Sequence, residues 1–212
     1  MIMFSEQRIS ALRTTVSERL SNDRFIHTLG VEKMALKLGE LFIPQAVNEL
    51  RCAALLHDIA KEIPMSKQKE LLITLENITD NDLASPATYH AFVGPIIVMR
   101  EFPEYATDNI LSSILKHTTL DWPLSVFDMI IYLSDYIEEG RSHSECCSVR
   151  DYLLNKCSSV YVPESRFKIL RSAVIMTLEN TVRFVNKKGG TVNRRTLIAL
   201  QNLNDTSNDI EN

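Results

Sequence analysis

The sequence predicts an all-α protein, and three observations support that prediction. Apolar residues recur at helical spacing along almost the whole chain, without the strict alternation that marks a half-buried strand. Hydrophobic residues make up 45% of the 212 residues and charged residues 24%, a profile typical of globular helical proteins. Only 6 glycines and 7 prolines interrupt the pattern, with no internal repeat or linker. We therefore expect a single helical domain over residues 1–204 and a frayed polar tail over 205–212.

The first helices are bounded by capping residues and prolines. Ser5 is expected to cap one helix, and Asn22 or Asp23 to cap the next. A third helix, over about residues 45–59, should follow Pro44 and end near Pro64, because a residue before proline disfavours helical geometry. A short helix is expected after residue 66.

Capping residues, prolines and glycines also mark the expected helices in the second half of the chain. The segment after Ser85 should form a helix bent at residues 94–95, where proline removes a backbone donor. Asp108 is expected to cap a helix that ends near residue 117, and Gly140 to close the apolar helix "LSVFDMIIYLSDYIEEGR". After a polar connection at 143–148, we expect a helix over 152–157, a long helix over 167–185 that stops at Gly189, and a short one over about 197–203.

Composition narrows the classes of partner. The net charge of −4 argues against a nucleic-acid surface, which needs a basic face. No segment resembles a signal peptide, and no apolar run approaches the ~20 residues that span a bilayer. The four cysteines lack metal-site or disulfide spacing, so we expect reduced thiols and a cytoplasmic protein without membrane contact.

Histidines and buried acids form the main chemical signal. Of five histidines, four fall within or at the ends of predicted apolar helices: His27, His57, His90 and His117. Asp58 and Asp135 are also placed in apolar helices, where a carboxylate is costly unless it is paired or binds a cation. Each histidine alone could be an ordinary core residue, but together these residues predict one cluster.

The stretch "ALLHDIAK" places His57 beside Asp58. Helical neighbours point about 100° apart, so the two side chains would reach a metal from different sides. Because a carboxylate can bridge two cations, the pair could belong to a site for one metal ion or for two. Imidazole with carboxylate suits iron, manganese, cobalt or zinc better than magnesium or calcium.

The order H…HD…H…H…D resembles that of the HD-domain metal phosphohydrolases. The blocks "RFIHTLGV", "AALLHDIAKEI", "YHAFVG", "ILKHTT" and "YLSDYIEEGR" are similar to those of the bacterial YqeK-type symmetrical diadenosine tetraphosphate hydrolases. This similarity covers about residues 24–141 and, weakly, "TVNRRTLIALQNL". Two positions depart from the family pattern: Leu120 stands where glycine is usual and Glu139 where proline is common. Neither departure removes an expected ligand.

The resemblance implies a helical HD-type bundle that hydrolyses diadenosine tetraphosphate to two ADP with a metal-activated water. Iron is the favoured metal, held by four expected ligands: His27, His57, Asp58 and Asp135. His90 and His117 could bind a second metal, or could face the phosphates and protonate the leaving group. We favour the phosphate-facing role, in which they act in catalysis with Asp58 and Lys61.

Several neighbours could contact a nucleotide. Arg24 lies one turn before His27 and could clamp phosphate, as could Arg141, although either could be an ordinary surface arginine. Lys61 could neutralise phosphate charge or simply be solvated, and the segment after the long helix could be a plain connection. The expected substrate contacts are Arg24, His27, His90, His117, Thr118, Asp135, Arg141, Gly190, Thr191, Val192, Asn193 and Arg194.

Three other functions remain open at this point. The chain could be another HD-type nucleotidase or phosphodiesterase, a di-iron redox enzyme, or a non-catalytic nucleotide-binding module. The expected partner is a small nucleotide substrate, and a homodimer is possible.

Overall fold

A computed structural model describes residues 4–208 of the chain. Within this range the protein is built from helices, without a strand. The α-helices are α1 Glu6–Ser17, α2 Asn22–Phe42, α3 Val47–Leu56, α4 Met65–Leu72, α5 Asp80–Leu83, α6 Tyr89–Glu101, α7 Asp108–Lys116, α8 Val126–Ile137, α9 Ser144–Ser158, α10 Pro163–Lys187 and α11 Arg194–Asn208. Short 3₁₀ helices cover Pro44–Ala46, Pro86–Thr88 and Pro103–Tyr105. The predicted all-α class is confirmed.

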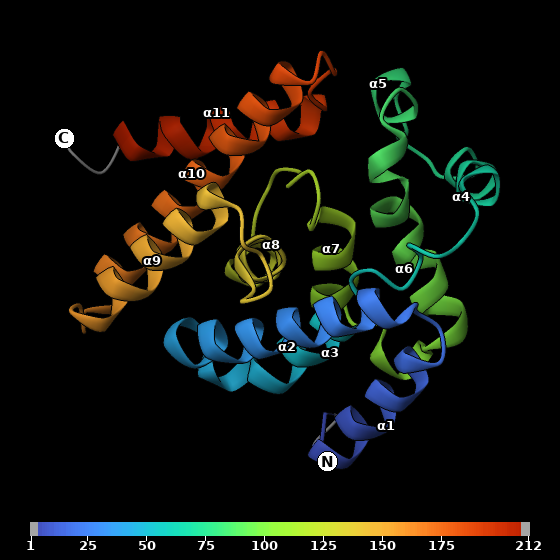
Figure 1. Cartoon of the computed structure of the whole chain (residues 1–212), viewed down its shortest axis with the longest axis horizontal. Helices are drawn as coiled ribbons and strands as arrows, with labels where there is room; N and C mark the ends of the chain where they lie inside the picture. The colour runs from blue at the N-terminus through green and yellow to red at the C-terminus, as the bar shows by residue number, and fades with distance from the viewer. Residues whose placement is uncertain (1–3, 209–212) are drawn as a thin grey trace.

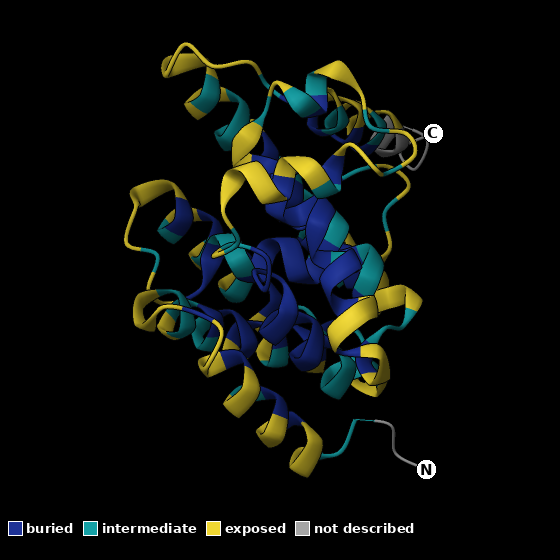
Figure 2. Cartoon of the chain, turned by 90° about the vertical axis from the view of Figure 1, so that its right-hand side faces the viewer, coloured by how far each residue is buried: buried dark blue, intermediate teal, exposed yellow. Residues whose placement is uncertain are grey.

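Helix α8 lies at the centre of the assembly (Figure 1), where it packs against α2, α3, α7, α9 and α10. In this view α2 and α3 lie side by side below α8, α6 and α7 lie to one side of it, and α9 to α11 lie to the other. Figure 2 shows buried residues, in dark blue, gathered in the interior and exposed residues at the periphery. Leu38, Leu50, Leu55, Ile131 and Leu133 are fully buried there. This core supports the helices and turns that carry the histidines.

The helix starts show why some cap predictions were wrong. Ser5 caps α1 as expected, and its side chain accepts a hydrogen bond from the backbone N–H of Arg8. The cap of α2 is Ser21, and that of α7 is Thr107, whose hydroxyl accepts from the N–H of Ile110. Each true cap therefore lies one residue before the acidic or amide residue that was predicted, which instead opens the helix.

Two predicted helix ends lie further along the chain than the observed ones. Helix α3 stops at Leu56, so the His57–Asp58 pair lies in a series of turns rather than on the helix. Lys61 donates its backbone N–H to Asp58 in this turn. Helix α8 stops at Ile137 rather than at Gly140, because the backbone of Glu138 leaves the helical region, with ψ at 154°.

Other elements were longer than predicted, or were missed. The expected polar connection at 143–148 is mostly helical, because α9 begins at Ser144, and the predicted 152–157 helix is only its second half. The short helix α5 was missed, and α6 continues through Pro95 after a 3₁₀ turn at Pro86. Helix α11 extends to Asn208, so residues 205–208 are not the expected frayed tail, while 209–212 lie outside the described residues.

Among the described helices, none is both long and apolar enough to cross a bilayer.

Candidate metal and phosphate site

Three helices and two turns bring the six predicted ligands into one cluster. His27 comes from α2, His90 from α6 and Asp135 from α8, while the turn after α3 supplies His57 and Asp58 and the turn after α7 supplies His117. Two compact groups of ligand atoms occur among the described residues: His27, His57 and Asp58, and then Asp58, His90 and His117. Within each group the ligand atoms lie within 4.8 Å of one another. Asp58 is common to both groups.

The two oxygens of Asp58 face different neighbours. Its Oδ1 lies 3.3 Å from His90 Nε2 and 3.6 Å from His117 Nε2. Its Oδ2 lies 3.6 Å from His57 Nε2 and accepts a 2.7 Å hydrogen bond from Arg24. This is the arrangement that a bridging carboxylate needs, although it serves a single ion equally well.

The rings of two histidines are oriented by contacts between Nδ1 and backbone carbonyl oxygens. The Nδ1 atoms of His57 and His117 lie 2.6 Å from the carbonyl oxygens of Ala54 and Ile114, three residues earlier in each case. A ring that donates from Nδ1 keeps Nε2 as the acceptor that a metal requires. The Nε2 of His57 is buried and makes no hydrogen bond with any described residue. Such an atom fits a metal ligand, because buried polar atoms are otherwise almost always paired.

His27 meets the second carboxylate. Its Nε2 lies 3.0 Å from Asp135 Oδ1, and the same oxygen accepts a 2.8 Å hydrogen bond from Arg141. Arg141 also donates to the Asp135 carbonyl oxygen at 3.1 Å. Asp135 is therefore beside the first group of ligands, as predicted, with an arginine held against it.

The electrostatics favour ionised carboxylates with a neutral ring at His57, whereas at His27 the neighbouring Asp135 raises the pKa against the effect of burial. Burial lowers the pKa of His57 to about 4, so this ring is neutral at pH 7. Burial alone would raise the pKa of Asp58, but the facing His57 and His117 hold it well below its usual range. The pKa of Asp135 is also lowered, against burial, by the neighbouring His27 and the charge on Arg141. With this donor set, the cluster indicates a site for a divalent metal ion.

Further polar side chains contact His90 at the edge of the cluster. Lys61 Nζ lies 3.1 Å from His90 Nε2, which is itself 3.1 Å from His117 Nε2. The hydroxyl of Thr118 lies 3.3 Å from the same atom of His90. Burial lowers the pKa of Lys61. Cationic groups thus flank the cluster on several sides: Arg24, Lys61 and Arg141.

The segment 190–194 lies against a different set of contacts. The Asn193 side chain is buried and donates to Asp82 at 3.1 Å, and the N–H of Arg194 donates to Asn81 at 2.7 Å. One turn later, Thr196 donates to the carbonyl oxygen of Thr119 at 3.0 Å. This end of α11 therefore packs on the loop that follows His117. A nucleotide contact from the segment stays a prediction, and the Asn193 amide already has a structural role.

Sequence reasoning missed Glu138 and Arg195. Glu138 is buried with Oε1 3.3 Å from His27 Nδ1. Arg195 binds Asp82 at 3.0 Å, pairs with Asp121, and holds α11 in place. An acid just after an apolar helix could have indicated Glu138, whereas the Arg195 contacts join residues 74 and 113 positions apart and leave no local pattern.

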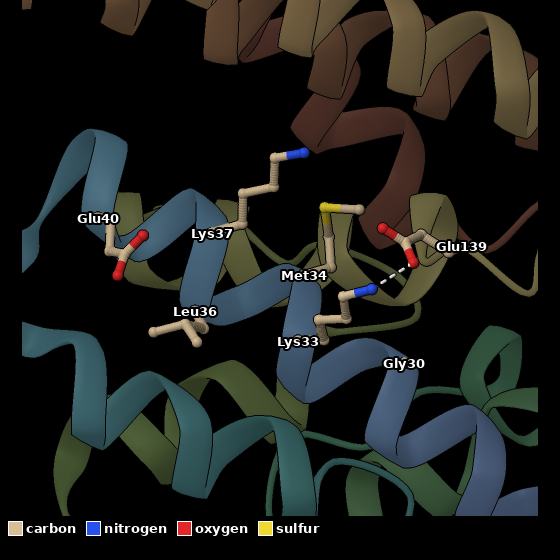
Figure 3. Close-up of a pocket in the computed structure, with 7 residues that line it drawn as sticks. All are labelled: Gly30, Lys33, Met34, Leu36, Lys37, Glu40 and Glu139. Carbon is tan, nitrogen blue, oxygen red and sulfur yellow. Dashed lines mark hydrogen bonds and ion pairs between the residues drawn. The ribbon is translucent and has the colours of Figure 1, made fainter.

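A surface cavity of about 240 Å³ lies along α2 (Figure 3). Its lining runs from Gly30 to Glu40 on α2 and includes Glu139, which pairs with Lys33 at 2.6 Å. None of the six predicted ligands lines it. The cavity is thus separate from the histidine cluster.

Comparisons with known proteins agree with this geometry. The HD domain matches residues 24–140. A protein of Bacillus subtilis (strain 168) named "Bis(5′-nucleosyl)-tetraphosphatase, symmetrical" is 30% identical over 174 residues, which cover 82% of this chain and 85% of that protein. A Staphylococcus aureus protein of the same name is 26% identical over 181 residues, 84% and 90% of the two chains.

The fold also matches a solved structure. It is that of a Clostridium acetobutylicum protein described as a predicted HD superfamily hydrolase involved in NAD metabolism. The TM-score is 0.78 at 26% identity, over 96% of this chain and 99% of the other. The chain therefore belongs to the HD domain family and, within it, groups with the symmetrical bis(5′-nucleosyl)-tetraphosphatases.

Proposed function

We propose that the protein hydrolyses diadenosine tetraphosphate symmetrically, with a divalent metal, to two ADP. The observation that carries this proposal is Asp58, which is shared by two histidine groups and surrounded by cationic side chains. The names of the Bacillus subtilis and Staphylococcus aureus relatives supply the substrate class. The reaction breaks the central phosphoanhydride bond with one water, whose hydroxyl joins one ADP while the other ADP leaves.

In this proposal His27, His57, Asp58 and Asp135 hold the metal, and iron is the favoured ion with manganese, cobalt or zinc as alternatives. A divalent metal supplies Lewis acidity and activates water at neutral pH. His90 and His117 either hold a second ion or face the phosphates, where one of the two rings, in contact through their Nε2 atoms, would donate a proton to the leaving ADP.

The cations complete the proposed site. Arg24 and Arg141 are held against the carboxylates at 2.7 and 2.8 Å, from where they can contact phosphate oxygens of a substrate. Lys61 and Thr118 lie next to His90 and would bind the same phosphate chain. Their positive charge would offset the charge that develops on the oxygens in the transition state.

Product chromatography on diadenosine tetraphosphate tests the reaction. Metal-replete protein should give ADP alone, and elemental analysis of protein purified without chelator would identify the metal. The variant Asp58→Ala should lose activity by at least ~10³-fold, since it removes the shared ligand, whereas Asp151→Ala, at an exposed position on α9, should leave it unchanged. AMP with ATP as products would contradict symmetrical cleavage.

The same assays separate the other functions. Turnover of mononucleotides or cyclic nucleotides in place of the dinucleotide would favour another HD-type phosphohydrolase. An oxygen requirement would favour redox chemistry, and a metal-replete protein inert to every nucleotide would favour a binding module. A cytoplasmic location and a homodimer stay predictions.

A further inference from the structure

Glu138 is a buried acid that the proposed reaction does not use. It follows α8 directly and is 5% exposed. Its Oε1 lies 3.3 Å from Nδ1 of His27, on the side of the ring opposite Nε2 and Asp135. A carboxylate buried this deeply costs free energy unless it is paired, so its place behind the ring needs a reason.

We propose that Glu138 is a positioning residue, which holds the ring of His27 through Nδ1 so that Nε2 faces the metal cluster. This inference rests on the metal site of the proposed function. The other two fixed rings, His57 and His117, use carbonyl oxygens behind Nδ1 for the same purpose. Carbonyl oxygens and carboxylates are the usual partners of metal-binding histidines, and a carboxylate also makes the ring a stronger ligand.

Two glycines leave the space that the carboxylate fills. A Cβ added at Gly30 would lie 2.4 Å from Glu138 Oε2, and one at Gly140 would lie 2.9 Å from both carboxylate oxygens. The N–H of Gly140 donates to Oε2. A larger residue at position 30 would therefore move the carboxylate without changing its charge.

The backbone around Glu138 is held from α9. The guanidinium of Arg150 donates to the carbonyl oxygens of Ile137 at 2.6 Å, Glu138 at 2.6 Å and Arg141 at 2.7 Å. These bonds fix the turn after α8 independently of His27. A purely structural role for the Glu138 side chain, as partner of the Gly140 N–H, would consequently affect folding but not the metal.

Cobalt(II) binding separates these roles without relying on nucleotide hydrolysis. The apparent affinity, from competition with a chelator, and the visible absorption of bound cobalt are measured for each variant. Glu138→Ala should bind about 10- to 100-fold more weakly with an altered spectrum. Glu138→Gln keeps an oxygen that can accept from Nδ1 and should recover part of that loss. His27→Ala gives the loss expected when the ligand itself is missing.

The neighbouring Glu139 provides the matched control. Its carboxylate points away to Lys33 across the cavity (Figure 3), and its side chain is 57% exposed, so Glu139→Gln should bind cobalt like the parent. Gly30→Ala should also weaken cobalt binding, as Glu138→Ala does. Thermal melting of the metal-free proteins reports whether each variant folds. If Glu138→Ala does not fold, Gly30→Ala provides the test. Parent-like affinity and spectrum in folded Glu138→Ala or, failing that, in Gly30→Ala overturn the proposal. Weakened cobalt binding in a protein that does not cleave diadenosine tetraphosphate would instead refute the proposed substrate alone.

Discussion

Leu120 has a backbone conformation that usually belongs to glycine. Its φ is +52°, in the left-handed region, while its side chain is fully buried. A side chain in this region costs roughly 1 kcal/mol, which glycine avoids. Leucine at this position therefore combines backbone strain with apolar burial in the loop that follows His117.

Substitutions at position 120 should therefore reverse the usual order of alanine and glycine. Leu120→Ala loses the buried side chain and keeps the strain, so we expect it to lower the free energy of unfolding by about 2–4 kcal/mol. Leu120→Gly loses the same packing but relieves the strain, and should be as stable as the alanine variant or more so. Urea unfolding of both proteins measures this. A glycine variant clearly less stable than the alanine variant would contradict the argument.

At the scale of elements, α11 is held to the rest of the fold by a buried polar network. Asp82 of α5 is 1% exposed and accepts from Arg195 and Asn193, and the Arg195 guanidinium lies 5.2 Å from the Phe92 ring of α6. Although burial opposes it, hydrogen bonds from Arg195, then Thr79 and Asn193, lower the pKa of Asp82 to about 2. An ionised Asp82 therefore holds the start of α11 against α5.

The resulting stabilisation should depend on pH in a defined direction. Because the folded pKa of about 2 lies below the ordinary value of 3.8, the contribution is complete above about pH 4 and is lost as pH falls toward 2. Asp82→Asn should lower the free energy of unfolding at pH 7 by about 2 kcal/mol and flatten its decline between pH 4 and 2. Denaturant unfolding across this pH range tests it, with the exposed Asp80→Asn on the same helix as control. An unchanged acid slope in Asp82→Asn would refute it.

The spacing of apolar residues predicted which helices carry the site more accurately than it predicted where those helices begin and end. The apolar periodicity of α2, α6 and α8 placed His27, His90 and Asp135 correctly, because those residues lie within helices. The turn that contains His57 and Asp58 was read as helix, since its apolar residues continue the pattern past Leu56. The start of α9 was missed because its first turn is polar and has few apolar residues to mark a face.

At the scale of the whole molecule, the candidate site is a junction of distant segments. The expected metal ligands come from α2, α8 and the turn after α3, which are separated by up to 108 positions between His27 and Asp135. Their order along the chain made the cluster predictable, since each residue is costly in an apolar helix unless the others are near. Glu138 gives a weaker signal of the same kind, because it lies just after the apolar helix rather than within it, and its position behind His27 required the structure.

A metal that joins these segments should stabilise the whole fold. A ligand that binds only the folded state at 100 times its dissociation constant adds about 2.7 kcal/mol, which for a chain of this size raises Tm by about 5–10 °C. We expect the melting temperature to fall by that amount after chelation and to recover when iron, manganese, cobalt or zinc is restored. Asp58→Ala should melt at nearly the same temperature with and without metal, because it removes the ligand shared by both histidine groups. A parent protein whose melting temperature is unaffected by chelator and metal, under conditions where elemental analysis shows it to be loaded, would contradict the role of the cluster as a cross-link between helices.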